Sequence, residues 1–406
     1  MSIVQETPYF VTHEEARAIC MKHPISSSIE MVKLDDAHSR ILAQDLISKV
    51  NDPPFDNSSM DGFASQWDES ATYPQTLRII GIQTASGSNA GLPVGAGEAV
   101  RIMTGAPMPP GANAILPIEQ CSVDEGEGTV VFHGAPKPHF VRKCGENLRE
   151  KSVGLTKGAY LTPSRVGLCA TMGYATVPVY RRLRIGIVST GDELKPPGED
   201  LAFGEIYESN SYGIAGLVSW VGHEPIRFTA VADTLEELRA ALDKAAETCD
   251  MILTSGGVSM GEYDMVRKLM EDEGEIHFWR VKIRPGSPPI FGTWRGKPIF
   301  GLPGNPVSSH VVFRMIVAPY IRDSLQADGP KEWIVRAKLC DPVKSTEDCL
   351  TLRRVTLAST DEGMMAYQPK HQGSGNLDSL ASADGLTLLE AGQHGEVGQW
   401  IDVIVL

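Results

Sequence analysis

The fold of this chain is decided by the stretch Met251-Ile-Leu-Thr-Ser-Gly-Gly-Val-Ser-Met-Gly-Glu-Tyr-Asp264, in which an apolar run leads into a glycine-rich turn. Such a run, bounded by glycine, is typical of a buried strand that ends in a tight turn. It follows a segment that opens with Thr234-Leu-Glu-Glu237, a capping-box pattern, and in which leucines recur at helical spacing. A capped helix followed by a buried strand predicts one step of an alternating arrangement of strands and helices.

The same alternation continues outward from this stretch. Residues 184–188 and 226–231 are predicted strands, and residues 211–221 are a predicted helix between them. Alternating strands and helices predict a mainly parallel sheet with helices on both faces. We therefore predict an α/β domain that begins near residue 182.

The segments on either side of this domain are richer in turns. Residues 77–132 hold short apolar runs separated by Gly, Pro and Asn, which predict a small β domain. From about residue 331 the chain returns to short strands, which predict a terminal β domain. Near the N-terminus, Thr12 opens a capping-box pattern that predicts a helix, and residues 35–46 predict a second helix. The stretch 56–64 is too polar and too rich in small residues for a core element.

The composition is that of a globular chain with many turns, because 42% of its 406 residues are hydrophobic and 22% are charged, with 40 Gly and 27 Pro. That length allows roughly two to four domains.

No signal-peptide pattern opens the chain and no window approaches about twenty unbroken apolar residues, which predicts a cytoplasmic protein without a membrane span. A net charge of −14 argues against nucleic acid and anionic membrane as partners. The 7 cysteines lack a C-x-x-C spacing and predict packed thiols.

Three turns follow predicted strands of the α/β domain and lead into helices. They are Ser189-Thr-Gly-Asp-Glu193, the turn within residues 254–264 and Gly301-Leu-Pro-Gly-Asn-Pro-Val-Ser308. Because ligands bind outside the carboxyl ends of parallel strands, we expect all three turns to line one crevice. Glycine lets the backbone approach a ligand closely, and free N–H groups at helix starts bind anions. None of the turns has the Walker-A or G-x-G-x-x-G pattern, so the sequence predicts a binding site of another kind.

Basic residues gather in one segment, since residues 276–322 contain no Asp or Glu. The cations there are Arg280, Lys282, Arg284, Arg295, Lys297, Arg314 and Arg322. If residues 278–284 form a strand, Arg280, Lys282 and Arg284 project from one face, because side chains alternate along a strand. This pattern is compatible with an oxyanion site and equally with a solvated edge strand protected by cations.

Three carboxylates, Glu193, Asp233 and Asp264, fall at or just beyond predicted strand ends. Each taken singly is compatible with a helix cap or a surface acid. Grouped near a phosphate-binding edge, they suit Mg²⁺, which prefers carboxylate and water ligands.

Six motifs, in order along nearly the whole chain, resemble those of the MoeA family of molybdopterin molybdenumtransferases. The motifs are Asn57-Ser-Ser-Met-Asp-Gly-Phe-Ala64, Arg101-Ile-Met-Thr-Gly-Ala106, Ser189-Thr-Gly-Asp-Glu-Leu194, Ser255-Gly-Gly-Val-Ser-Met-Gly-Glu262, Gly301-Leu-Pro-Gly-Asn-Pro-Val307 and His371-Gln-Gly-Ser374. The family's members are cytoplasmic enzymes that insert molybdenum in the last step of molybdenum-cofactor synthesis.

The resemblance implies a homodimer of four-domain chains. The implied domains are an elongated domain I from residues 1–50 and 145–181, a small β domain II over residues 51–144, a molybdopterin-binding α/β domain III over residues 182–327 and a C-terminal β domain IV over residues 328–406. It also implies an active site between domain III of one subunit and domain II of the other, so that Asp61 and Thr104 complete the partner's site.

The resemblance also implies roles for particular residues. Catalytic roles are implied for Asp61, Thr104, Glu193, Asp233 and Asp264, and the last three would also bind Mg²⁺. Substrate-binding roles are implied for Ser255, Gly256, Gly257, Arg280, Arg284, Pro303, Gly304, Asn305, Arg354 and Ser374. The implied substrates are adenylylated molybdopterin and molybdate, the products are molybdenum cofactor and AMP, and molybdopterin adenylyltransferase is an implied handover partner.

Two other functions stay open beside this one: molybdopterin adenylyltransferase itself, whose domain resembles the α/β part, and a non-catalytic paralogue that binds molybdopterin or scaffolds partners. The sequence departs from the family pattern at Arg280 and Arg284, where Lys is common, at Ser287, where Pro-Gly-Lys-Pro is usual, and at Asn147, where Asp is frequent. These departures leave the choice between molybdate and tungstate open.

Overall fold

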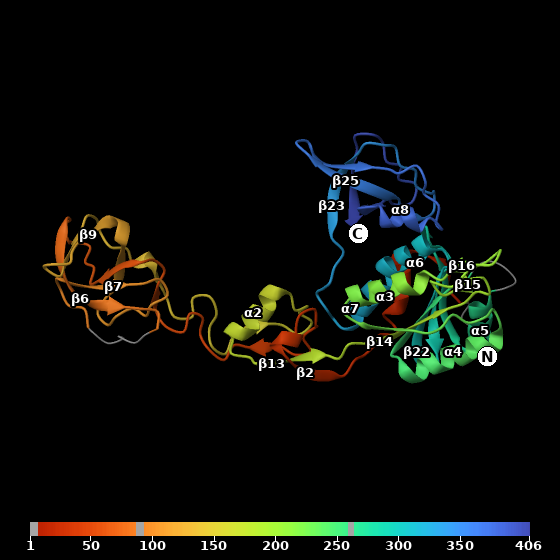
Figure 1. Ribbon diagram of the computed structural model, residues 1–406, viewed down its shortest axis with the longest axis horizontal. Coiled ribbons are helices and arrows are strands. Elements are labelled where there is room, and N and C mark those ends of the chain that lie inside the picture. Colours follow the sequence, from red (N-terminus) through yellow and green to blue (C-terminus); the bar gives the residue numbers. More distant parts are fainter. Residues whose placement is uncertain (1–6, 87–92, 259–263) are drawn as a thin grey trace.

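A computed structural model describes residues 7–86, 93–258 and 264–406 of the chain. The molecule is long, with a small β domain at one end and the α/β domain at the other (Figure 1). A narrow segment that contains helix α2 (Pro163–Thr171) joins the two, and the C-terminal β domain lies beside the α/β domain. The multidomain α/β plus β architecture predicted from the sequence is therefore confirmed.

The α/β domain is built on a seven-stranded sheet in the order β1-β19-β21-β22-β18-β14-β17. Its strands are β1 (Tyr9–Val11), β14 (Arg184–Ser189), β17 (Glu224–Arg227), β18 (Met251–Ser255), β19 (Glu275–Val281), β21 (Ile290–Trp294) and β22 (Lys297–Leu302). Strands β22, β18, β14 and β17 are parallel, while β21 runs antiparallel to both of its neighbours. The mainly parallel sheet is confirmed, and its parallel half is the half that carries the predicted turns.

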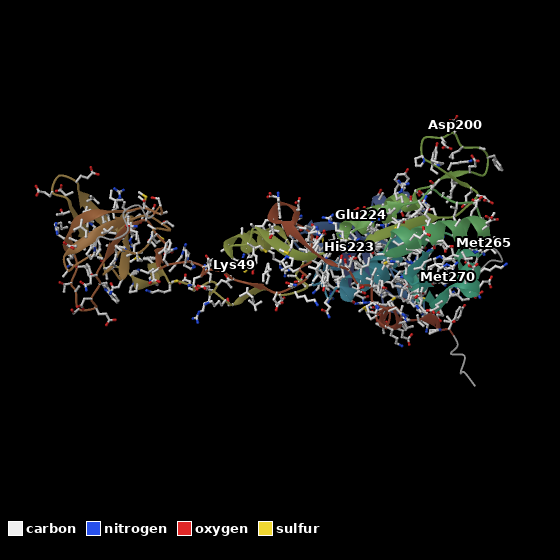
Figure 2. The ribbon with its side chains drawn as sticks, turned by 90° about the horizontal axis from the view of Figure 1, so that it is seen from below. Lys49, Asp200, His223, Glu224, Met265 and Met270 are labelled. Carbon is white, nitrogen blue, oxygen red and sulfur yellow. The ribbon has the colours of Figure 1, made fainter. Side chains whose placement is uncertain are left out.

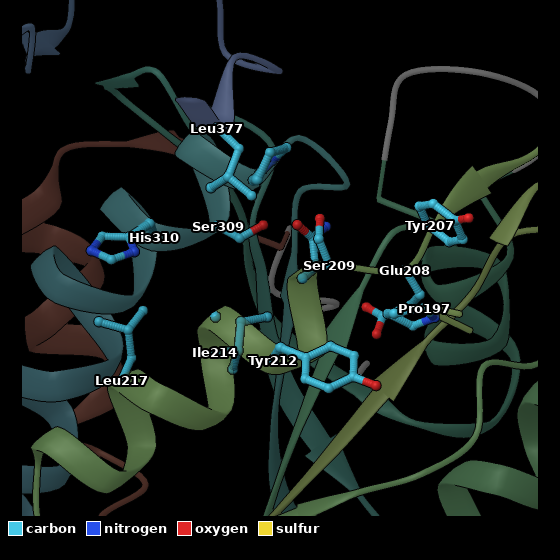
Figure 3. Close-up of a pocket in the computed structure, with 13 residues that line it drawn as sticks. Pro197, Tyr207, Glu208, Ser209, Tyr212, Ile214, Leu217, Ser309, His310 and Leu377 are labelled. Atoms are coloured by element: carbon cyan, nitrogen blue, oxygen red, sulfur yellow. The ribbon is translucent and has the colours of Figure 1, made fainter. Parts of the chain in front are cut away.

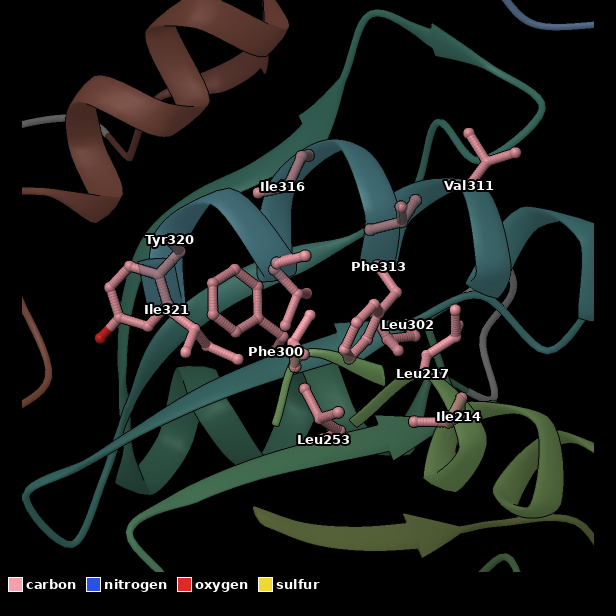
Figure 4. Packing of buried hydrophobic residues seen from close by; sticks show 14 of the residues in the cluster. Ile214, Leu217, Leu253, Phe300, Leu302, Val311, Phe313, Ile316, Tyr320 and Ile321 are labelled. Carbon is pink, nitrogen blue, oxygen red and sulfur yellow. The ribbon is translucent and has the colours of Figure 1, made fainter. Parts of the chain in front are cut away.

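Helices cover both faces of this sheet. They are α3 (Asn210–Trp220), α4 (Leu235–Thr248), α5 (Met265–Glu273), α6 (Pro306–Val312) and α7 (Ala318–Ser324), with a π-helical turn (Phe313–Val317) joining the last two. As predicted, Thr234 caps α4, since its side chain accepts a hydrogen bond from the Glu237 N–H. On one face Ile214 of α3, Phe313 and Phe300 of β22 are buried in one apolar cluster (Figure 4). Loss of a buried Phe typically costs about 3–5 kcal/mol, so this layer holds the parallel strands in place.

The first described residues lie on the α/β domain. Strand β1 pairs in parallel with β19, and helix α1 (His13–Cys20), which has the predicted capping box at Thr12, buries Ala16 and Cys20 in the same core. The domain division implied by resemblance assigns residues 1–50 to domain I. The structure shows instead that the first part of that segment completes the sheet of the α/β domain, because its apolar side chains are buried there.

The joining segment has a small core of its own. It is formed by β2 (Ile29–Lys33), β3 (Leu46–Ile47), β12 (Val153–Leu155), α2 and β13 (Thr176–Tyr180). The helix predicted over residues 35–46 is wrong: only a 3-10 turn (Leu34–Asp36) forms there, and Ser39 has a left-handed φ of 61°. Beyond it the backbone of Leu42 bonds to Ala159, so the apolar residues are buried by pairing with a distant segment.

The small β domain contains a six-stranded sheet in the order β8-β5-β7-β6-β10-β9. Its strands are β5 (Gly62–Ser65), β6 (Gln75–Gln83), β7 (Glu98–Ile102), β8 (Ala114–Pro117), β9 (Cys121–Asp124) and β10 (Thr129–Phe132). The β fold predicted for residues 77–132 is confirmed. The prediction that residues 56–64 form no core element is wrong, because β5 is fully buried between β7 and β8. A Cβ at Gly62 would lie 2.1 Å from the Leu116 carbonyl oxygen, so only a glycine allows this strand to pair so closely.

The C-terminal domain is a closed barrel, which confirms the terminal β domain predicted from the sequence. The barrel strands are β23 (Ile334–Leu339), β25 (Arg354–Thr360), β26 (Gly363–Tyr367), β27 (Gly385–Leu388) and β28 (Trp400–Val405). A short helix α8 (Leu377–Ala381) and the segment before it lie next to α6 of the α/β domain.

A two-stranded ribbon projects from the α/β domain beside the carboxyl edge of its sheet. It consists of β15 (Leu194–Lys195) and β16 (Ile206–Tyr207), and Figure 2 shows the connecting loop at Asp200 standing away from the domain. Among the described residues, no helix is both long and apolar enough to cross a membrane.

Candidate active site

A polar pocket of about 610 Å³ lies at the carboxyl edge of the parallel strands. The ends of β14, β18 and β22 form its floor, because these strands are parallel neighbours whose carboxyl ends meet at one edge. Eight of the predicted site residues line it: Glu193, Asp233, Ser255, Gly256, Gly257, Pro303, Gly304 and Asn305. The expected crevice is therefore present, although residues 259–263 of the central turn lie outside the described residues.

The turn after β18 packs against the turn after β14 at backbone distance. Gly256 has a φ of 96°, and a Cβ there would lie 2.7 Å from the Thr190 carbonyl oxygen. The Thr190 N–H donates to the Ser255 carbonyl at 3.1 Å, and the Gly256 N–H donates to the Leu302 carbonyl at 3.2 Å. Only glycine permits this approach at a left-handed position, so the three turns form one tightly joined surface.

Two carboxylates border the pocket on the β14 side. Glu193 follows the turn after β14, and Asp233 lies in the segment that leads to α4. The Asp233 N–H donates to Asp192 Oδ1 at 3.0 Å, which ties the two segments together. The pocket thus combines backbone turns suited to anions with acidic side chains suited to a cation.

Asn210 joins the turns on the opposite side, and it is not among the site residues predicted from the sequence. Its Nδ2 donates to Ser255 Oγ at 2.7 Å and to the Gly304 carbonyl at 2.6 Å. Its Oδ1 and the Thr190 Oγ1 are buried without a hydrogen-bond partner among the described residues. Buried polar atoms left unpaired are costly, so these two suit a bound ligand. A polar residue directly before the helix predicted over residues 211–221 was the only signal in the sequence.

A second missed residue, Glu208, lines the pocket next to Asn210. It is 6% exposed, accepts hydrogen bonds from the hydroxyls of Ser189 and Ser211, and lies 3.7 Å from the Arg227 guanidinium. A buried carboxylate is stable only when it is paired and hydrogen-bonded in this way. Glu208 therefore fixes the start of α3 relative to the end of β14.

The barrel domain reaches the pocket through the loop before α8. Asn305 Nδ2 donates to Ser374 Oγ at 3.0 Å, and the Val307 N–H donates to the Ser374 carbonyl at 3.1 Å. Arg354 is 1% exposed and is not among the described residues that line the pocket. Its Nη2 donates to the carbonyls of His371 and Gly373. Arg354 thus holds the loop that places Ser374 at the pocket's edge.

Asp264 lies at the start of α5, and in the described part of the chain it is not among the residues that line the pocket. Its Oδ1 accepts the Arg267 N–H at 3.0 Å, while its Oδ2 is buried without a partner among the described residues. Burial raises the pKa of this carboxyl from 3.8 to about 6. Near neutral pH the carboxylate is therefore charged, and one of its two oxygens has no hydrogen-bond donor among the described residues.

The three acids predicted to bind Mg²⁺ are not brought together. Within the described residues, no three His, Cys, Asp or Glu side chains gather in a way that could hold a metal ion. Mg²⁺ commonly takes one or two carboxylates, completed by water and phosphate oxygens. Glu193 and Asp233, which border the same pocket, fit that smaller ligand set.

The predicted basic strand is interrupted, since β19 ends at Val281 and a separate short strand (Ile283–Arg284) follows. The alternation survives, because Val281 and Ile283 are buried and the three cations are not. Arg280 Nη1 donates to the Tyr9 hydroxyl at 2.6 Å, and its Cζ lies 4.8 Å from the centre of the Phe10 ring. Lys282 Nζ lies 5.7 Å from the same ring, whereas Arg284 is exposed. Neither Arg280 nor Arg284 is among the described residues that line the pocket.

Two departures from the family pattern have local structural roles. Ser287 is buried and its hydroxyl donates to the Ile283 carbonyl at 2.8 Å, which closes the turn after the cations. Asn147 Nδ2 donates to Asp52 Oδ2 at 3.2 Å. An aspartate at residue 147 would place a second carboxylate against Asp52, so the amide suits this neighbour.

Asp61 and Thr104 form a pair in the small β domain, at the far end of the molecule from the pocket (Figure 1). The Thr104 N–H and hydroxyl both donate to Asp61 Oδ1, at 2.6 and 2.8 Å. These hydrogen bonds, the backbone one first, lower the pKa of Asp61 below its ordinary value. The two residues therefore contact each other, and within one chain they cannot reach the α/β pocket; that they complete the partner's site stays a prediction.

An α/β domain with glycine-rich turns at the carboxyl edge of its parallel strands is typical of one class of protein, the molybdopterin-binding domains. Residues 186–323 match the family described as "Probable molybdopterin binding domain". Residues 11–173 match "MoeA N-terminal region (domain I and II)", and residues 336–406 match "MoeA C-terminal region (domain IV)".

Curated relatives and solved structures agree. The chain is 38% identical to the molybdopterin molybdenumtransferase of Haemophilus influenzae over 329 residues, 80% of this chain and 79% of that protein. It is 31% identical to that of Bacillus subtilis over 404 residues, 97% and 93% of the two chains. A MoeA structure from Pyrococcus horikoshii aligns with a TM-score of 0.82 and 26% identity over 98% of this chain and 100% of that one. The chain belongs to the MoeA family of molybdopterin molybdenumtransferases, which are enzymes of molybdenum-cofactor biosynthesis.

Proposed function

We propose that the protein inserts molybdenum from molybdate into adenylylated molybdopterin and releases AMP, with Mg²⁺ as cofactor. The observation that carries the proposal is the pocket at the carboxyl edge, where backbone turns for an anion and two carboxylates face one space. A substrate with a pyrophosphate and a bound divalent cation needs both features at once.

Each wall of the pocket has a part in this reaction. The turns at Gly256 and Gly304 bring backbone within reach of phosphate oxygens, because no side chain covers them. Glu193 and Asp233 would hold Mg²⁺, which when bound neutralises the charge that develops on the pyrophosphate. Asn210 and Ser374 fix the turns relative to one another, so that much of the catalysis is positioning.

The active enzyme in this proposal is a homodimer whose two sites are shared. Asp61 and Thr104 are exposed and already bonded to each other at the end of the molecule opposite the pocket. A second copy that runs in the opposite direction would bring this pair to the first copy's α/β pocket. Molybdopterin adenylyltransferase, which makes the substrate, is the proposed handover partner, and the cytoplasm is the proposed location.

The direct test is to incubate the purified protein with adenylylated molybdopterin, Mg²⁺ and molybdate, and to assay AMP and active cofactor. We expect both products to form in equal amounts and to require molybdate. Formation of adenylylated molybdopterin from molybdopterin and ATP would favour the adenylyltransferase instead. Binding of molybdopterin with no release of AMP would favour a non-catalytic role. Matches to the MoeA family on both sides of the α/β domain favour the first outcome.

A further inference from the structure

A second pocket, of about 400 Å³, lies directly beside the polar one. Its walls come from α3, α6 and Leu377 of α8, and Figure 3 shows Ile214, Leu217 and Leu377 arranged around one space. The residues that line both pockets are Tyr207, Glu208, Ser209, Asn210, Pro306 and Leu377. One ligand can therefore extend from the apolar pocket into the polar one.

An aromatic ring is held in place on this pocket's wall. The Arg227 guanidinium carbon lies 3.4 Å from the centre of the Tyr212 ring, which is a close cation–π stack. Arg227 is itself fixed, because its Nε donates to Ser211 Oγ at 2.7 Å. The Tyr212 ring is thus ordered before any ligand arrives, and a flat ligand ring can stack near it at small entropic cost.

His310 gives the pocket an unused donor and an unused acceptor. Burial and the nearby Arg314 charge lower the pKa of His310 to about 4, so its imidazole is neutral at pH 7. A neutral imidazole has one N–H and one lone pair, and no hydrogen bond from this ring is found among the described residues. The edge of a purine offers the complementary acceptor and donor.

We propose that the apolar pocket binds the adenine ring of the substrate's adenylyl group, with the phosphates reaching past Asn210 into the polar pocket. The volume of 400 Å³ lies within the range of roughly 300–1,000 Å³ found for ligand pockets, and its lining is mostly apolar with few polar groups. The inference rests on the proposed function for the identity of the nucleotide. A pterin ring, which is polar on most of its edge, suits the polar pocket better.

Two glycines of α3 provide a matched pair of variants. Gly213 lines the apolar pocket, and a Cβ added there would meet nothing within 4 Å. Gly216 is equally open on the same helix but, in the part of the chain that the structure describes, does not line either pocket. Leucine at either position fits the helix better than glycine, so neither change should harm folding. Gly213→Leu fills the pocket, and Gly216→Leu is its control.

The test is equilibrium dialysis of the full-length protein with radiolabelled AMP and Mg²⁺. We expect the unchanged protein to bind AMP, Gly213→Leu to weaken binding by about tenfold or more because the ring loses its burial, and Gly216→Leu to leave it unchanged. Tyr212→Ala should weaken it by on the order of fivefold or more through loss of stacking. Thermal unfolding of each variant serves as the check on folding.

Three results would overturn the inference: equal AMP binding by Gly213→Leu and the unchanged protein, no AMP binding at millimolar concentration, or displacement of AMP by a simple pterin from the same pocket. Because the readout is binding, its outcome is separate from that of the insertion assay. If Gly213→Leu loses AMP binding while the unchanged protein binds AMP but forms no cofactor in the insertion assay, the nucleotide site stands and the proposed function is rejected.

Discussion

Asp264 and Asp61 are assigned to one site, yet they lie in different domains and in opposite surroundings. Asp264 is 8% exposed, its Oδ2 has no partner among the described residues, and burial raises its pKa to about 6. Asp61 is exposed, and two hydrogen bonds from Thr104 lower its pKa. The first carboxylate has a charge that its own chain leaves unsatisfied, whereas the second is already satisfied.

This difference teaches which half of the proposed site is incomplete. A buried carboxylate with a free oxygen is stabilised by a cation or by a hydrogen-bond donor from outside its own fold. An exposed carboxylate held by its neighbours is positioned to be presented to another molecule. We infer that the α/β half receives substrate and ion, and that the β-domain half is supplied to it.

The largest expected effect comes from Asp264→Asn, which removes one charge with little change of shape. We expect loss of cofactor formation, measured as AMP and active cofactor, with folding intact. Asn still accepts the Arg267 N–H as a helix cap, and it relieves the cost of burying a charge. Unchanged turnover would exclude a catalytic role for Asp264.

The same variant should change how stability depends on pH. Since the folded pKa of Asp264 is raised from 3.8 to about 6, the folded state binds more protons than the unfolded state between these values. The carboxyl therefore stabilises the fold below about pH 4, and this contribution, on the order of 2 to 3 kcal/mol, is lost as the pH rises to about 6. In urea unfolding, the free energy of unfolding of Asp264→Asn should rise relative to that of the unchanged protein as the pH rises from about 4 to about 6. A constant difference would mean that Asp264 titrates normally.

A second experiment tests whether the two halves come from different chains. Asp61→Ala and Asp264→Ala subunits, each inactive alone, should recover partial activity when mixed and allowed to exchange. A heterodimer then carries one site with both carboxylates intact, provided that the sites are shared. Size-exclusion chromatography with differently tagged subunits verifies the heterodimer, and verified heterodimers without activity would argue against shared sites.

The contrast between the two halves also explains what the sequence could reveal. The turns at Gly256 and Gly304 were predicted, because strand ends in an alternating α/β pattern meet at a known edge. Asn210 was missed, since its role depends on bonds to turns that are distant in sequence. Distances of this kind follow from packing, and no local pattern encodes them.

Two of the errors in secondary structure have a similar origin. The residues around Leu42 have helical spacing, but their apolar side chains are buried by pairing with a segment more than a hundred residues away. Strand β5 looks too polar for a core, yet Gly62 is needed because β8 approaches so closely. Tertiary contacts overrode local preference in each case.

A smaller effect, on the concentration of molybdate that the enzyme requires, should distinguish Arg284 from Arg280 and Lys282. Arg284 is exposed beside the turn at Ser287, while Arg280 is engaged by the Tyr9 hydroxyl and Lys282 lies near the Phe10 ring. If Arg284 contacts molybdate, Arg284→Ala should raise the molybdate requirement by on the order of tenfold, because a charge-assisted hydrogen bond contributes about 1.5 to 3 kcal/mol. Lys282→Ala should change it much less. Equal, small effects at matched ionic strength would identify the run as a solvated basic strand.

The smallest expected effect concerns the link between the barrel and the pocket. Ser374→Ala removes the hydroxyl that accepts from Asn305 Nδ2 at 3.0 Å but keeps the backbone bond from the Val307 N–H. A net hydrogen bond contributes about 1 kcal/mol, so we expect the rate of cofactor formation at low substrate concentration to fall roughly fivefold. Ser382→Ala, at an exposed serine just after α8, is the matched control and should change nothing. If both variants behave like the unchanged protein, the loop is held at the pocket by its backbone alone, and the barrel's contribution to the site is one of shape.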